Sequence, residues 1–168
     1  MSLRYALLGM LAVTPGTGYE LAQRFDSSMS NAWYASHSQI YPELAKLCEE
    51  GMLEVVGEGP RRSRTFGITQ AGRDDLRDWL VETEPNRNQR NETTIRWFLL
   101  KLLPADDRRA VLQREIADVT AYHADLQASE AALEDMDPPH PFLPMVNLAV
   151  RTAAVMLDWL KEQLAAIE

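Results

Sequence analysis

SHSQIYPELAKLCEEGMLE, residues 36–54, is the stretch that decides how the first half of this chain folds. Its apolar residues recur at spacings of four, three and one, which predicts one buried helical face: Ile40, Leu44, Leu47 and Cys48. Gly51 is a natural C-cap and ends that helix. Pro42 is unexpected, because in the second turn it lacks the N–H that would bond back to Ser38, and its ring crowds that carbonyl.

Two helices are predicted before this stretch. Apolar residues at helical spacing form the first, which ends in the TPGTG turn at residues 14–18: Leu3, Leu7, Leu8 and Leu11. Thr17 and Glu20 then form a capping box, in which each side chain accepts a hydrogen bond from the other residue's backbone N–H. A second helix therefore begins there, and it buries Leu21 and Phe25.

A β-hairpin and a fourth helix are predicted after it. MLEVV (52–56) and RTFGI (64–68) have the composition of short strands, and GEGPRRS (57–63) has that of a turn. Thr69 caps a helix that runs through Leu76, Trp79 and Leu80. Three helices and a hairpin follow the order of a winged helix-turn-helix. The predicted fold class is therefore mainly α with a small β-hairpin wing, followed by a helical C-terminal domain.

In such a fold the third helix enters the DNA major groove, and its first residues contact base edges. Short polar side chains at its start suit that position: His37, Ser38 and Gln39. We hypothesise that Pro42 bends the entry of this helix. The alternative is that the helix begins at Ser38 and tolerates Pro42 near its start.

Composition limits the class of protein. The chain has 168 residues and is 46% hydrophobic, which suits one large or two small folded domains. No run of about 18 apolar residues exists, so no membrane span is expected. Cys48 is the only cysteine, which excludes a disulfide within the chain and fits the cytoplasm. The net charge of -8 is unfavourable for DNA binding, but GPRRSR at residues 59–64 is locally basic.

A polar segment, TEPNRNQRNE at residues 83–92, divides the chain. We expect a DNA-binding domain at residues 1–82, a linker at 83–92 and a helical dimerisation and effector domain at 93–168. Apolar residues near a 3.5-residue spacing predict a helix at 105–136: Leu112, Ile116, Val119, His123, Leu126 and Leu133. Three prolines follow this helix, and a last helix is expected at 142–167.

This last helix is apolar over most of its surface, which is typical of a helix buried on several sides. A partner subunit is the natural cover in so small a chain, so we expect a homodimer. The expected interface residues are Phe142, Met145, Ala149, Met156, Trp159, Leu160 and Leu164. The alternative is burial inside the helix's own domain.

The first half resembles the PadR family of transcriptional regulators. The resemblance covers about residues 3–82 and is carried by four stretches: GYELAQRF (18–25), SQIYPEL (38–44), GMLE (51–54) and FGITQAGRDDLRDWL (66–80). The second half is similar to the helical C-terminal region of the longer PadR-like proteins, including the virulence-activator type. One departure is Phe66, which replaces the tyrosine common in the family wing. The resemblance implies a homodimer that binds pseudo-palindromic operators in double-stranded DNA and represses transcription, often until a small molecule binds.

Carried over by position, the resemblance places Tyr19, Gln39 and Tyr41 at the DNA face. A phosphate suits the Tyr19 hydroxyl and the backbone N–H groups at the start of the second helix, and Gln39 can pair bidentately with adenine. The alternatives are a solvated Gln39 that caps at Ser36, and a Tyr41 ring packed on the second helix. Other residues expected at DNA are His37, Ser38, Lys46, Arg61, Arg62 and Arg64. The three arginines lie at the wing tip, where the alternative is a solvated turn.

Trp97, Trp159 and Met156 are candidate lining for an effector pocket, with plain core packing as the alternative. No cofactor or metal is expected, because no ligand spacing is visible, and His123 suits a hydrogen-bonded core position. No nucleophile motif, phosphate loop or Glu-x-x-His pair occurs, so we do not expect an enzyme. The rival class is a winged helix used only for protein contacts. Acidic charge favours that class, and the basic wing opposes it.

Overall fold

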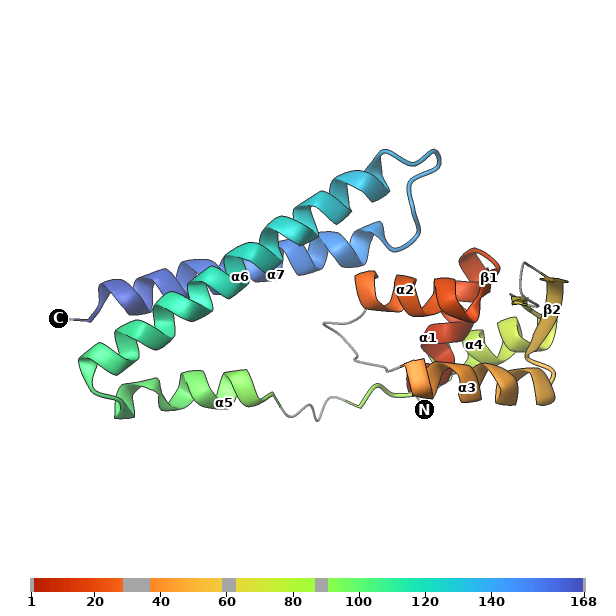
Figure 1. Cartoon of the computed structure of the whole chain (residues 1–168), viewed down its shortest axis with the longest axis horizontal. Coiled ribbons are helices and arrows are strands. Elements are labelled where there is room, and N and C mark those ends of the chain that lie inside the picture. Colours follow the sequence, from red (N-terminus) through yellow and green to blue (C-terminus); the bar gives the residue numbers. More distant parts are fainter. Residues whose placement is uncertain (1, 29–36, 59–62, 87–90, 168) are drawn as a thin grey trace. The chain divides into compact units, whose positions relative to one another are not determined.

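The computed structural model describes residues 2–28, 37–58, 63–86 and 91–167 and divides into two units, Met1–Asn86 and Arg87–Glu168 (Figure 1). The first unit contains α1 (Ser2–Val13), β1 (Gly16–Thr17), α2 (Gly18–Ser28), α3 (His37–Glu49), β2 (Leu53–Glu58), β3 (Arg64–Ile68) and α4 (Gln70–Glu82). The second contains α5 (Glu92–Leu99), the 3-10 helix η2 (Leu100–Leu102), α6 (Ala105–Glu134) and α7 (Leu143–Ala165). The predicted fold class, a winged helix-turn-helix followed by helices, is confirmed.

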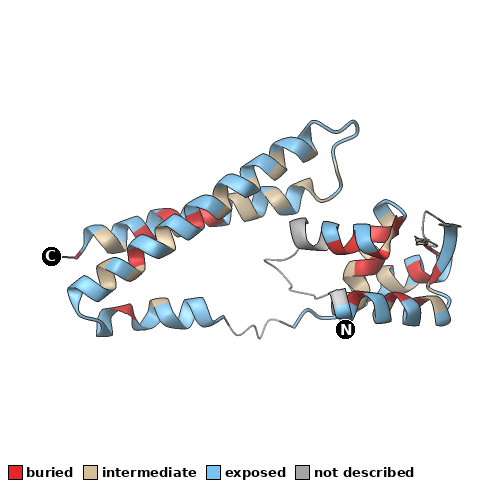
Figure 2. Cartoon of the chain, viewed as in Figure 1, coloured by how far each residue is buried: buried red, intermediate tan, exposed pale blue. Residues whose placement is uncertain are grey.

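The core of the first unit is built by α1, α2 and α3 (Figure 2). Its largest fully buried side chains are among those that the helical spacing predicted: Leu7, Leu8, Leu11, Leu21, Ile40, Leu44 and Leu47. Leu3, also expected in this core, is only partly buried, and the Phe25 side chain lies outside the described residues. Cys48 differs from the expectation, because it is only partly buried at the end of α3. That burial still raises the pKa of the Cys48 thiol.

The wing is a three-stranded antiparallel sheet in the order β1-β3-β2. β1 was not predicted, because two residues inside a turn carry no alternating pattern. It pairs Gly16 with Phe66 and Thr17 with Thr65, and so fastens the start of α2 to the wing. The β2–β3 register shifts between Val55 and Gly57, which bends the hairpin at that point.

The predicted caps are present. The Thr17 N–H donates to Glu20 Oε2 at 2.7 Å, and the Glu20 N–H donates to Thr17 Oγ1 at 3.2 Å, which completes the capping box. Thr69 Oγ1 accepts from the Gly72 N–H at 3.1 Å and caps α4. Gly51 has a φ of 73°, the left-handed conformation that glycine adopts most easily after a helix.

Arg4 ties α1 to two other elements of the first unit. Its guanidinium donates to Glu50, just after α3, and from Nη2 to Asp75 Oδ2 on α4 at 3.1 Å. The hydrogen bond from Arg4 lowers the pKa of the Glu50 carboxyl. One residue on, the Tyr5 ring stacks on Trp79 of α4 at a centroid distance of 4.3 Å and an angle of 7°. α1, α3 and α4 are therefore joined by directional contacts as well as by the core.

In the second unit α6 and α7 pack against each other along their length. Their core combines both helices with η2 and the chain end: Leu100, Leu112, Val119, Leu157, Leu160 and Ile167. Both long helices lie close to their predicted limits. α6 ends at Glu134, two residues before the predicted end, and α7 begins at Leu143, one residue after the predicted start. His123 is partly buried on α6.

Candidate nucleic-acid interface

The first turn of α3 presents polar side chains to solvent, and Ile40, which follows them, packs into the core. Ser38 and Gln39 are exposed, and Ile40 is fully buried. Pro42 lies inside α3 in its second turn and is exposed, and the helix continues past it to Glu49. The backbone of His37 begins α3, whereas its side chain lies outside the described part of the chain. The helix start that we expected to contact bases is thus a solvent-facing surface.

Tyr41 lies across the start of α2. A Cβ atom built on the buried Gly18 would lie 2.5 Å from Tyr41 Cε1, so a larger residue at this position would force the ring to move. Tyr41 nevertheless keeps 49% of its surface exposed. The contact supports the packing alternative for its ring, while about half of the side chain stays at the surface.

The start of α2 differs from what the sequence suggested. Tyr19 is 58% exposed, and its hydroxyl accepts a hydrogen bond from Gln23 Nε2 at 2.9 Å. Bonds from the Thr17 backbone and then from its hydroxyl lower the pKa of Glu20, so an ionised carboxylate occupies this helix end. The N–H groups of Thr17 and Glu20 are already used in the capping box. A phosphate here would meet Tyr19 and Gln23 rather than those two donors. Sequence reasoning missed Gln23, although its place one turn after Tyr19 could have shown it.

The basic residues expected at DNA are not all brought together. Arg64 is exposed at the start of β3, while Arg61 and Arg62 lie outside the described residues. Lys46 is exposed on α3, but it lies seven residues beyond Gln39, about 10 Å along the axis. Its Nζ is 3.9 Å from Glu50 Oε1, and that ion pair draws it toward the end of α3 opposite the polar start.

Two of the candidate effector residues, Trp97 and Trp159, contact each other in the second unit. The Trp97 and Trp159 rings lie 5.4 Å apart at an angle of 34°, and Trp97 Nε1 donates to Glu115 Oε2 at 3.1 Å. Met156 and Trp97 pack against the core of α6 and α7.

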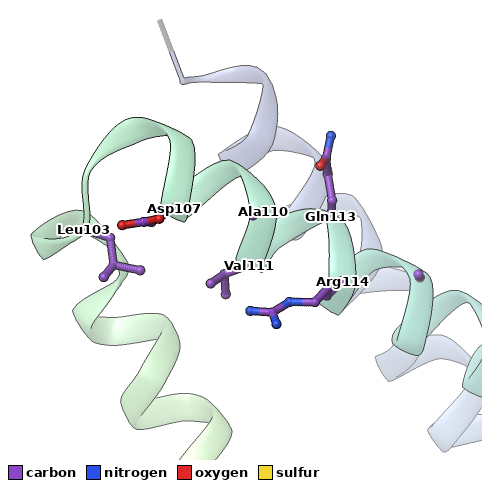
Figure 3. A pocket seen from close by; sticks show the side chains of 7 residues that line it. Leu103, Asp107, Ala110, Val111, Gln113 and Arg114 are labelled. Carbon is purple, nitrogen blue, oxygen red and sulfur yellow. The ribbon is translucent and has the colours of Figure 1, made fainter.

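A separate open groove of about 700 Å³ lies along α6 (Figure 3). Its lining is Leu103, Asp107, Ala110, Val111, Gln113, Arg114 and Ala117, and it includes none of the candidate effector residues. Among the described residues, no group of three or more His, Cys, Asp or Glu side chains is placed to hold a metal ion.

The residues expected at a dimer interface fall into three groups by burial. Leu160 is fully buried by its own unit, so its surface is already covered. Met145 and Trp159 are exposed, and the others are partly buried: Phe142, Ala149, Met156 and Leu164. By length and composition alone, α7 is long and apolar enough to cross a membrane. Only 17% of its most apolar 18-residue window is buried within the second unit. The helix therefore has an apolar surface that the described chain leaves open.

Comparisons with known proteins agree with this architecture. Residues 7–78 match the model of the transcriptional regulator PadR-like family. The chain is 26% identical over 177 residues to the negative transcriptional regulator PadR of Bacillus subtilis, covering 99% of this chain and 97% of that protein. The crystal structure of Bacillus subtilis PadR in complex with operator DNA is similar over 100% of both chains, with a TM-score of 0.83 and 26% identity. Its crystal structure in complex with p-coumaric acid is similar over 99% of both, with a TM-score of 0.78 and 27% identity.

Proposed function

We propose that this chain, a PadR-like transcriptional regulator, binds operator DNA as a homodimer in the cytoplasm, represses transcription and is not an enzyme. The observation that carries the proposal is the polar, solvent-facing start of α3, fixed on a fully buried stripe within a winged helix. A relative of the same architecture was crystallised with operator DNA, which supports this use of the surface.

We assign DNA binding to the first part of the chain, and dimerisation and effector binding to the second. Residues 1–82 bind DNA, residues 83–92 link, and residues 93–168 dimerise and take an effector. Trp97, Trp159 and Met156 are the proposed effector contacts, because the two tryptophan rings meet within the second unit and Met156 packs against the same core as Trp97. The relative crystallised with p-coumaric acid supports a small aromatic molecule as the kind of effector to test first.

The test is a footprint on the DNA upstream of the protein's own gene, followed by binding measurements over a range of salt concentrations. A protected pseudo-palindrome and a steep fall of affinity with salt are expected, because bound phosphates release counterions. Affinity without a salt slope, or no protection at all, would favour the protein-contact module.

Gln39→Ala is expected to lose about 1–3 kcal/mol of discrimination at one base pair in each half-site. Binding to random DNA should change far less, because it is mostly electrostatic. Competition with operators altered at single positions measures this loss. Glu49→Ala, at the other end of the same helix, is the matched control. An equal loss for every sequence would mean that Gln39 only positions the helix.

Replacing Arg61, Arg62 and Arg64 together with Ala is expected to weaken all DNA sequences about equally. The plot of log affinity against log salt should flatten by about one unit for each phosphate that the variant no longer neutralises. The control removes three exposed positive charges from the second unit: Lys101, Arg114 and Lys161. An unchanged slope in the wing variant would show that these arginines are only solvated.

A further inference from the structure

Tyr19 and Gln23 form an exposed pair on the first two turns of α2. Gln23 Nε2 donates to the Tyr19 hydroxyl oxygen at 2.9 Å, and both side chains face solvent. Four residues separate them, so they lie one above the other on the same side of the helix. The opposite side of the helix is fixed, because Leu21 and Ala22 are fully buried in the core of the first unit.

The direction of this hydrogen bond decides what the Tyr19 hydroxyl can still do. A phenol has one hydrogen to donate and an oxygen that accepts. Because the Gln23 amide is the donor, the Tyr19 oxygen is the acceptor, and the hydroxyl hydrogen remains for an acceptor outside the protein. Tyr19 is 58% exposed, so packing alone does not hold its hydroxyl, and the bond from Gln23 restricts the orientation of that group.

The charged groups beside the pair favour a neutral contact at this point. The Glu20 carboxylate accepts from the Thr17 N–H at 2.7 Å and from the Thr17 hydroxyl at 3.0 Å, and these bonds lower its pKa. An ionised Glu20 keeps a phosphate away from the helix end itself. Arg24 lies near the same carboxylate and donates to the Thr14 carbonyl oxygen at 3.2 Å. A phosphate at Tyr19 would therefore be bound by hydrogen bonding and not by a positive charge.

We propose that Gln23 is a positioning residue for DNA binding, which orients the Tyr19 hydroxyl so that it donates to one phosphate oxygen of the operator backbone. The inference rests on the proposed DNA binding and deepens it. The Tyr41 ring lies against Gly18, directly before Tyr19, and Tyr41 follows Gln39 by two residues at the start of α3. A phosphate at Tyr19 would thus lie next to the groove that the start of α3 is proposed to enter.

This contact differs from the proposed wing contacts in its dependence on salt. The affinity of a protein for DNA falls with salt because its cationic side chains displace counterions from the phosphates. A phenol and an amide carry no charge and displace no counterion. Loss of the Tyr19 contact should therefore lower affinity by a similar factor at every salt concentration, whereas loss of the wing arginines should flatten the slope.

The experiment is a double-mutant cycle in the full chain, with operator affinity measured at several salt concentrations. Tyr19→Phe removes only the hydroxyl and should weaken binding by about 10- to 100-fold, the usual effect of losing a hydrogen bond to a charged group. Gln23→Met keeps the length of the side chain but cannot donate, and it should weaken binding by about 3- to 10-fold. In the Tyr19→Phe background Gln23→Met should have no further effect, because no hydroxyl is left to orient. The slope of log affinity against log salt should match the wild type in all three variants.

Gln70→Met is the matched control. Gln70 is also exposed, and its Nε2 donates to Asp74 Oδ1 at 2.9 Å, one turn further along α4. Loss of this bond should leave both the operator affinity and the salt slope unchanged. Circular dichroism of each variant checks that the first unit remains folded.

Equal weakening by Gln23→Met in both backgrounds would overturn the inference, because Gln23 would then act without the Tyr19 hydroxyl. A salt slope that flattens in Tyr19→Phe, or an affinity that neither single variant changes, would overturn it as well. In each of these cases the wild type still binds its operator. A wild-type chain that protects no operator would instead refute the proposed function, so the two failures can be told apart.

Discussion

Gly72→Ala is expected to destabilise the first unit strongly and so to weaken DNA binding. Gly72 is buried near the start of α4, and a Cβ atom there would lie 2.3 Å from the Met52 carbonyl oxygen and 2.9 Å from Ile68 Cγ1. The nearer atom is backbone and cannot rotate away, so the wing and α4 must separate. We expect a cost of about 3 kcal/mol, at the upper end for overpacked cores. That is a large share of the stability of a small unit. Urea unfolding followed by circular dichroism measures it.

Gly9→Ala is the matched control for this substitution. Gly9 lies inside α1, and nothing approaches within 4 Å of an added Cβ atom. Alanine there should stabilise the unit by about 1 kcal/mol, because glycine weakens a helix interior. Destabilisation of both variants by similar amounts would show that the crowding at Met52 is not the cause.

Val155→Arg is expected to give a folded monomer whose operator affinity falls by about 10²–10⁴-fold. Val155 is 69% exposed within its own unit, so arginine should not disturb the α6–α7 core. In the proposed dimer, with this face of α7 against the partner subunit, the same arginine would bury an unpaired charge between subunits. A monomer binds its half-site alone, without the gain in affinity that comes from linking two sites. Sedimentation and operator binding measure the two effects.

The control for this prediction is Ala132→Arg, an exposed position on α6. It should retain both the dimer and the operator affinity. A monomeric Val155→Arg variant with unchanged operator affinity would show that one subunit is sufficient for binding. A stable dimer in that variant would show that the interface does not include Val155.

Local signals in the sequence predicted most of the fold. The stripe of Ile40, Leu44 and Leu47, the caps at Thr17 and Thr69, and the glycine after α3 all act within one or two turns, so spacing alone reveals them. β1 could not be predicted, because its two residues become a strand only by pairing with β3. The partial exposure of Cys48 likewise depends on what packs over the end of α3.

The candidate site was less accessible to sequence reasoning than the fold. The capping box was predicted, but its consequence for a phosphate at the start of α2 was not. That consequence depends on where the Glu20 carboxylate lies, because the carboxylate already accepts from the Thr17 N–H. The close approach of Tyr41 to Gly18 joins residues 23 positions apart, and no local pattern reveals it. Leu160 looked suitable for a partner because its spacing matched its neighbours, but the structure places it against α6.

The contacts of Arg4 have a consequence for regulation. Because the Arg4 guanidinium donates to Glu50 just after α3 and to Asp75 on α4, the helix that we propose contacts DNA cannot turn without breaking the Arg4–Glu50 contact and its own packing on the core. A small molecule bound in the second unit would find it costly to reshape that helix. The distance between the two recognition helices of the proposed dimer would be easier to change. Binding to both half-sites requires this distance to match one turn of DNA, about 34–36 Å. The effector would then release DNA by making the distance between the two helices differ from one turn of DNA, while each proposed DNA-binding surface stays intact.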